Sequence, residues 1–156
     1  MIFKTRQLEC AFSPYTECDN STLWGDCHFK TPRFTGKISY FMDVAEYRKF
    51  VIKPLQALAD SFGTTRREQI GNLHGNFFID FNLRPDGKVL CRYELSNDDR
   101  FNPEASTVFR GTFTTDHLHI GMWLTQARED LRAWKAPPDW WKLINGDDIS
   151  EIIKNG

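Results

Sequence analysis

The chain has 156 residues, of which 40% are hydrophobic and 26% charged, and its formal net charge is −1 at pH 7. This composition is typical of a globular protein, and the charge balance argues against a nucleic-acid-binding protein, whose footprint needs a clear basic excess. The length predicts a single domain at 1–156, with a core from about 22 to 134 and a tail at 137–156.

Targeting signals and membrane spans are not expected. No apolar stretch approaches the roughly 18 residues of a membrane span, and the first six residues lack the pattern of a signal peptide. We therefore expect a cytoplasmic protein that does not bind membranes and whose cysteines are reduced thiols. Their spacing fits no common zinc framework, so we expect no metal and no cofactor. The cysteines are Cys10, Cys18, Cys27 and Cys91.

The first half of the chain is predicted to form three strands followed by a helix. The strands are expected at about 1–12, 22–30 and 33–42, with a loop at 13–21. Asp43 can cap a helix to about residue 62, because its carboxylate accepts hydrogen bonds from free backbone N–H groups. Pro54 removes one helical hydrogen bond, so we expect a kink or a short break there. Gly63 ends the helix.

The second half is predicted to contain three more strands and a second helix. Arg84-Pro85-Asp86-Gly87 is the clearest turn in the chain, because proline fits its second position and glycine the left-handed one. The turn joins two alternating strands into a hairpin, and Phe77, Ile79 and Phe81 are expected to face the core. The predicted elements are strands at about 73–82, 89–95 and 107–114 and a helix at about 116–134.

A short pattern occurs in both halves. Phe34-Thr35-Gly36 precedes Asp43 and the first helix, and Phe109-Arg110-Gly111 precedes Asp116 and the second. We interpret both copies as scaffold: each phenylalanine enters the core, each aspartate caps a helix, and each glycine allows close packing or a bulge.

These elements predict an α+β fold. We expect a mostly antiparallel sheet of about six strands with two main helices packed on one face, in the order β-β-β-α-β-β-β-α plus a short C-terminal helix. The opposite sheet face is then free to be polar. The tail is expected to pack back on the core, because Trp140 and Trp141 are costly to leave in water.

Candidate catalytic and metal-binding groups have simpler structural explanations. His117 and His119 lie two positions apart in the second helix and point about 200° away from each other, so one helix face cannot chelate with both. Cys27 and His28 are adjacent in a strand and project to opposite faces. No phosphate-binding glycine loop, nucleophile elbow or Cys-x-x-Cys pair is present. We therefore expect no enzyme activity.

The outward face of the sheet is the most promising functional surface. By strand alternation it carries aromatic rings among charges of both signs, which is typical of protein interfaces. Its carboxylates, together with those of a neighbouring loop, would suit a basic partner surface. The candidate partner-binding residues are Trp24, Asp26, His28, Phe41, His74, Phe78, Asp80, Arg92, Glu94, Asp98, Asp99 and Arg110.

Three stretches follow one another in order between residues 22 and 134. They are Leu23-Trp24-Gly25-Asp26, Phe34-Thr35-Gly36-Lys37-Ile38 leading to Asp43-Val44-Ala45-Glu46-Tyr47-Arg48-Lys49-Phe50, and Gly75-Asn76-Phe77-Phe78-Ile79 ahead of Asp86-Gly87. This order resembles that of WapI-like immunity proteins, a bacterial family that neutralises polymorphic or contact-dependent toxins. The resemblance implies a non-enzymatic antitoxin that binds one cognate toxin domain and blocks its active site by occlusion, without a cofactor.

Two other classes of function stay open at this point. A small metal- or thiol-dependent enzyme would use His28, His74 or Cys27. A structural subunit would self-associate through the tail that carries Trp140 and Trp141.

Overall fold

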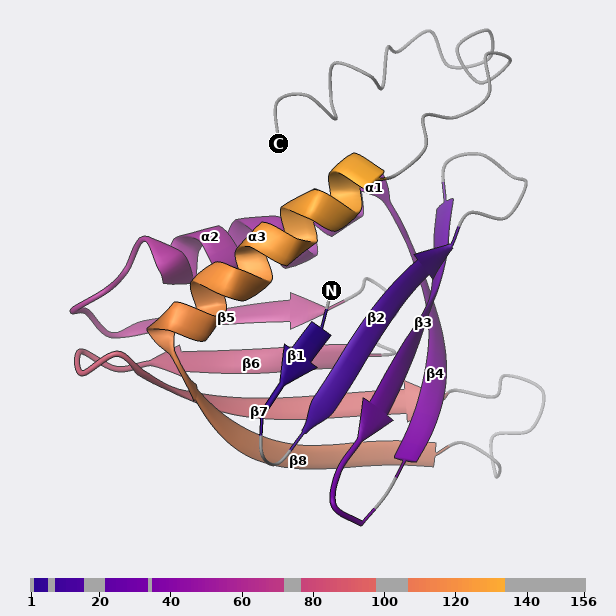
Figure 1. Ribbon diagram of the computed structural model, residues 1–156, viewed down its shortest axis with the longest axis horizontal. Helices are drawn as coiled ribbons and strands as arrows, with labels where there is room; N and C mark the ends of the chain where they lie inside the picture. Colours follow the sequence, from indigo (N-terminus) through magenta and orange to yellow (C-terminus); the bar gives the residue numbers. More distant parts are fainter. Residues whose placement is uncertain are drawn as a thin grey trace, which may run out of the picture.

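The computed structural model describes residues 2–5, 8–15, 22–33, 35–71, 77–97 and 107–133, which form two four-stranded antiparallel sheets (Figure 1). In each sheet the strands lie in chain order. The N-terminal sheet consists of β1 (Ile2–Lys4), β2 (Glu9–Tyr15), β3 (Thr22–Lys30) and β4 (Thr35–Asp43). The C-terminal sheet consists of β5 (Arg66–Gly71), β6 (Phe77–Leu83), β7 (Lys88–Asn97) and β8 (Thr107–Asp116).

Helical segments follow each sheet. After β4 come α1 (Val44–Tyr47), the π-helical turn η1 (Arg48–Ile52) and α2 (Lys53–Ala59), and β8 leads directly into α3 (His117–Ala133). Helices α2 and α3 pack against each other (Figure 1). The predicted α+β class, the antiparallel pairing and the position of a helix after each group of strands are confirmed.

The strand count and the number of sheets differ from the prediction. The described residues form eight strands rather than about six, in two sheets rather than one. The segment predicted as a single first strand contains both β1 and β2, which pair with each other. The sequence does not predict β5, because Ile70 is the one buried side chain in a strand that is otherwise polar.

Strand β2 continues through Pro14 to Tyr15, where a loop is expected. Pro14 lies opposite Gly25 of β3, whereas β1 pairs with β2 only as far as Ala11. Among the described residues, no strand therefore pairs with the other side of β2 at Pro14. Proline is tolerated in a strand where one edge is unpaired, which explains why the turn-like composition does not end the strand.

A kink or a short break is expected at Pro54, but the helical conformation continues from Val44 to Ala59, with a π-helical turn just before the proline. In that turn the N–H of Lys53 donates to the carbonyl of Arg48, five residues earlier. The change of hydrogen-bonding pattern falls where proline cannot donate the next helical bond.

Helix α2 ends at Ala59, three residues earlier than predicted. The N–H of Ser61 donates to the carbonyl of Leu58 at 3.1 Å, which tightens the chain into a turn, and Gly63 follows with a left-handed φ of 79°. The turn leaves Phe62, at the predicted end of the helix, 67% exposed. The apolar spacing from Val44 to Phe62 predicts a buried side chain there, and that prediction is wrong.

The hydrophobic core contains side chains from both sheets and from the helices that follow them. The alternation predicted for the hairpin is confirmed, because every second residue of β6 from Phe77 to Leu83 is buried. The steps of three and four between Ile120, Trp123, Leu124, Ala127 and Leu131 predict one apolar face for α3, and all five side chains are buried. The Trp123 ring lies 6.4 Å from the rings of both Phe81 and Phe113. The remaining predicted segments, the tail and its C-terminal helix, lie outside the described residues.

Both glycines of the repeated pattern lie beneath an aromatic ring of the neighbouring strand. Gly36 pairs with Phe29 and Gly111 pairs with Tyr93, and a Cβ added to either glycine would overlap the ring of its partner. The Phe29 and Tyr93 rings lie 4.7 and 6.0 Å from the ring of Phe109, which joins the two sheets. The interpretation of these glycines as sites of close packing is confirmed.

Asp116 caps α3, as predicted. Its carboxylate accepts a hydrogen bond from the backbone N–H of His119 at 3.0 Å and another from the His119 ring at 2.8 Å. These bonds hold the pKa of Asp116 below its ordinary value of 3.8, and the backbone bond is the largest cause. The corresponding aspartate, Asp43, ends β4 immediately before α1, and its side chain lies outside the described residues.

We expect Asp116→Ala to lower the free energy of unfolding by about 1 kcal/mol at pH 7, because two donors at the helix start lose their acceptor. Since the folded pKa is the lower one, the part of the cap that depends on the carboxylate charge stabilises fully above the unfolded pKa and is lost as pH falls through the folded pKa. The urea-unfolding difference between variant and wild type should therefore shrink as the pH falls below about 4. Asp116→Asn, which keeps a neutral acceptor, is the control, and an Asp116→Ala deficit as large at pH 2 as at pH 7 would contradict this role.

Candidate functional site

The outer face of the C-terminal sheet brings predicted residues from three strands together. Strand alternation turns Phe78 and Asp80 of β6, Arg92 and Glu94 of β7 and Arg110 of β8 away from the core. The strand register places Asp80 opposite Arg92, and Glu94 opposite both Phe78 and Arg110. We call this surface, with Gln69 of β5 beside Asp80, the outer face.

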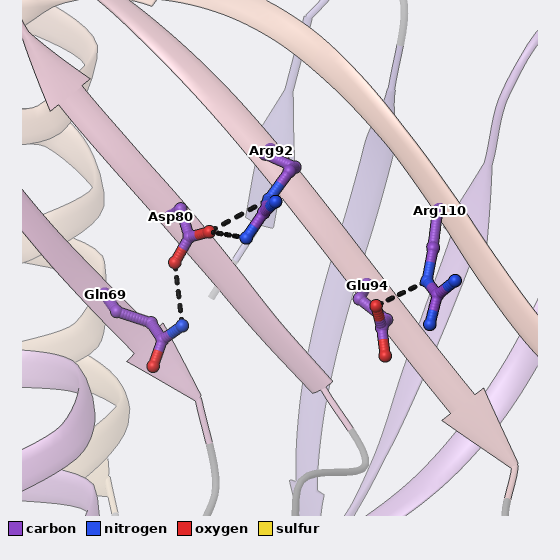
Figure 2. A network of polar contacts seen from close by, with 5 residues as sticks. All are labelled: Gln69, Asp80, Arg92, Glu94 and Arg110. Atoms are coloured by element: carbon purple, nitrogen blue, oxygen red, sulfur yellow. Dashed lines mark hydrogen bonds and ion pairs between the residues drawn. The ribbon is translucent and has the colours of Figure 1, made fainter.

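Charged side chains on the outer face form two ion pairs between neighbouring strands (Figure 2). Asp80 Oδ2 accepts from Arg92 Nη2 at 2.8 Å and from Nε at 3.0 Å, while Asp80 Oδ1 accepts from Gln69 Nε2 at 2.7 Å. Glu94 Oε2 accepts from Arg110 Nε at 2.5 Å. Both oxygens of Asp80 are therefore occupied by neighbours on the same sheet.

The cations of these pairs lie further out than the anions. The side chains of Arg92 and Arg110 are 68% and 69% exposed, whereas the side chains of Asp80 and Glu94 are 33% and 24% exposed. The hydrogen bond and the charge of Glu94 raise the pKa of Arg110 above its ordinary value, and an arginine is charged at physiological pH even without such a shift. The outer face thus presents positive groups to solvent and keeps its carboxylates beneath them.

Apolar groups lie among these charges. The half-buried Phe78 ring has the guanidinium carbon of Arg92 5.9 Å from its centroid, a distance at which a cation and a ring attract. Leu90 of β7 and Val108 of β8 occupy outward-facing positions of the same sheet and are 40% and 49% exposed. Arginine with an aromatic ring and exposed aliphatic side chains is the composition of a protein-binding surface.

The remaining candidates do not belong to this face. His28 is exposed and lies opposite Lys37, but on the N-terminal sheet. Trp24 lies opposite Phe41 in the same sheet; their side chains, and that of Asp26, lie outside the described part of the structure, as do His74, Asp98 and Asp99. The prediction of one shared outward face is wrong, because the described strands form two separate sheets, one that contains β3 and β4 and one that contains β5 to β8.

Gln69 is the residue of the outer face that the sequence does not predict. It belongs to β5, whose alternation consists of a single buried residue, Ile70, between Gln69 and Gly71, and that pattern is too short to predict a strand. A polar residue beside a buried isoleucine is the only signal for Gln69 in the sequence.

The buried cysteines are poorly suited to thiol chemistry. The Cys27 and Cys10 sulfur atoms are 3.0 Å apart in the core, and this contact together with burial raises the pKa of Cys27 far above that of a free thiol. Burial likewise raises the pKa of Cys91. Cys27 is buried and His28 exposed, so they lie on opposite faces of β3 as the alternation predicts.

The described ranges contain no metal-binding cluster and no membrane-spanning helix. No three His, Cys, Asp or Glu side chains gather there in an arrangement that could hold a metal ion. The ring of His117 bonds the carbonyl of Ala59 at 2.8 Å, while the ring of His119 bonds Asp116, so the two imidazoles have separate structural partners. None of the helices described is long and apolar enough to cross a membrane.

Comparison of the chain with models of protein families, with curated proteins and with solved structures finds no match. The resemblance to WapI-like immunity proteins therefore depends on the order of elements and the residues quoted above. Function has to be argued from the geometry of the outer face.

Proposed function

We propose that this chain is a cytoplasmic immunity protein of the WapI-like kind, which binds a cognate bacterial toxin domain and blocks its active site by occlusion. The observation that carries the proposal is the outer face itself: five predicted residues from three strands form one surface of paired charges around an aromatic ring. Occlusion requires complementary shape and charge but no reaction chemistry.

The rigidity of the outer face supports this role. Phe78, Asp80, Arg92 and Glu94 project from the two central strands, β6 and β7, of a sheet whose opposite side is core. Asp80 and Glu94 hold Arg92 and Arg110 in place. Side chains that are ordered before binding lose less conformational entropy when a partner arrives. A surface of this kind suits a tight inhibitor of one protein.

The proposal is tested by co-expressing the chain with the toxin domain encoded in the adjacent reading frame. We expect cells that carry both genes to grow, cells that carry the toxin gene alone to arrest, and the two proteins to co-purify as a stable complex. A catalytically dead toxin provides the control for expression burden. Growth arrest in the presence of the chain, together with separate elution of the two proteins, would reject the proposed function.

A further inference from the structure

We propose that the partner surface recognised by the outer face is acidic, and that its carboxylates bind the guanidinium groups of Arg92 and Arg110. This inference rests on the proposed function and names the chemistry of the partner. It replaces the expectation of a basic partner surface, which depends on Asp80 and Glu94 being available.

The carboxylates of the outer face are already neutralised. Asp80 accepts three hydrogen bonds through its two oxygens, from Gln69 and Arg92. Glu94 accepts from Arg110, and both acids lie beneath the arginines that pair with them. A basic partner would have to displace Arg92 or Gln69 to reach Asp80. At Glu94 it would find only Oε1 open, on a carboxylate that Arg110 already pairs, and it would meet the positive charge of the arginines first.

The arginines, in contrast, keep donors that point to solvent. Arg92 uses Nε and Nη2 on Asp80, and Arg110 uses Nε on Glu94. Within the described residues, Nη1 of Arg92 and both terminal nitrogens of Arg110 have no hydrogen-bond partner. A guanidinium can bind a second carboxylate through such a free edge, since it presents five donors in one plane.

The spacing of the two arginines suits neighbouring acidic side chains. Arg92 lies opposite Thr112, two residues from Arg110 on β8, so the two arginines are diagonal neighbours, about 7–8 Å apart at Cα. Acidic residues at alternate positions of an extended strand are separated by a similar distance, about 6.6 Å. Arg67 of β5 is also exposed and lies opposite Asn82, at an outward-facing position of the sheet. A third cation therefore extends the same surface.

A protein fits these observations better than a nucleic acid. The chain has a net charge of −1, which gives no long-range attraction to a polyanion. Phe78 is the one aromatic side chain on the described part of the outer face, whereas single-strand binders stack successive bases on several rings. The paired arginines therefore form a local acceptor for carboxylates rather than a phosphate-tracking surface.

The first test uses NMR titration of the isotope-labelled chain and does not require the toxin. We expect a glutamate-rich peptide to shift the side-chain Nε–H signals of Arg92 and Arg110 while leaving that of Arg132, at the end of α3, unchanged. A lysine-rich peptide should shift neither arginine. Shifts with a single-stranded RNA but not with the glutamate-rich peptide, or equal shifts at all three arginines, would overturn the inference.

The second test uses the toxin domain from the adjacent reading frame and isothermal titration calorimetry. We expect Arg92→Gln and Arg110→Gln each to raise the dissociation constant about 30-fold, which is the usual effect of removing a residue that contributes strongly to binding energy. We also expect higher salt to weaken wild-type binding. Lys53→Gln, which removes an exposed cation from α2, is the matched control, and thermal melts confirm that each variant is folded.

The outcomes separate the two proposals. Tight wild-type binding that both arginine variants retain would overturn the acidic-partner inference and leave the immunity function standing. Failure of the wild type to bind the toxin domain would reject the immunity function, while the peptide titration would still decide whether Arg92 and Arg110 recognise carboxylates.

Discussion

Replacing Phe113 by alanine is expected to lower the free energy of unfolding by about 3–5 kcal/mol, the usual cost of deleting a buried aromatic ring. Phe113 is 1% exposed. Its ring lies 6.2 Å from the ring of Tyr93 and 6.4 Å from that of Trp123, so it joins the C-terminal sheet to α3. Truncation removes these contacts and leaves a cavity at the junction.

Phe62→Ala provides the matched control for Phe113→Ala, because it deletes the same ring from a residue that is 67% exposed. We expect this control to change stability by no more than about 0.5 kcal/mol, as is usual for surface substitutions. Urea unfolding of the two variants measures the difference. Equal losses would contradict the assignment of Phe113 to the core and of Phe62 to the surface.

Gly111→Ala is expected to destabilise the fold by about 1–3 kcal/mol, the range for overpacking a core. The added Cβ would overlap the hydroxyl oxygen of Tyr93 and lie 2.6 Å from the nearest atom of its ring. Tyr93 is 5% exposed and packs against Phe109 and Phe113, so its ring has little room to move. The methyl group therefore forces a shift at the contact between the sheets.

A double-mutant cycle isolates the contact between Gly111 and Tyr93. In a Tyr93→Ala background the ring is gone, so Gly111→Ala should cost much less than it does in the wild type. Gly121→Ala in α3, where a new Cβ meets nothing within 4 Å, should instead stabilise by about 0.5–1 kcal/mol through helix propensity. Equal effects of Gly111→Ala in the two backgrounds would contradict the packing account.

Local periodicity predicts much of this fold. The alternation through Phe77, Ile79 and Phe81, the turn that contains Gly87 and the apolar stripe of α3 all follow from side-chain spacing, because each element buries one face. The cap at Asp116 follows from residue type at a strand-to-helix junction. These features depend on residues close together in the chain.

The arrangement of the strands depends on contacts between distant residues, and the sequence does not predict it. Parity alone places His28 and Arg92 on outward faces, but it cannot say that β3 and β7 belong to different sheets. Their placement in two sheets that pack against each other depends on tertiary contacts, such as the one between the rings of Phe29 and Phe109. For the same reason, the sequence predicts the residues of the outer face but not that Asp80 and Glu94 are covered by arginines.

The most direct test of the central claim is a backbone and side-chain NMR map of the labelled chain before and after addition of the adjacent toxin domain. We predict that the largest changes fall on the outer face, at Phe78, Asp80, Arg92, Glu94 and Arg110. Changes concentrated instead on the exposed Leu118 and Met122 of α3, with the outer face unaffected, would contradict the claim that this face binds the partner.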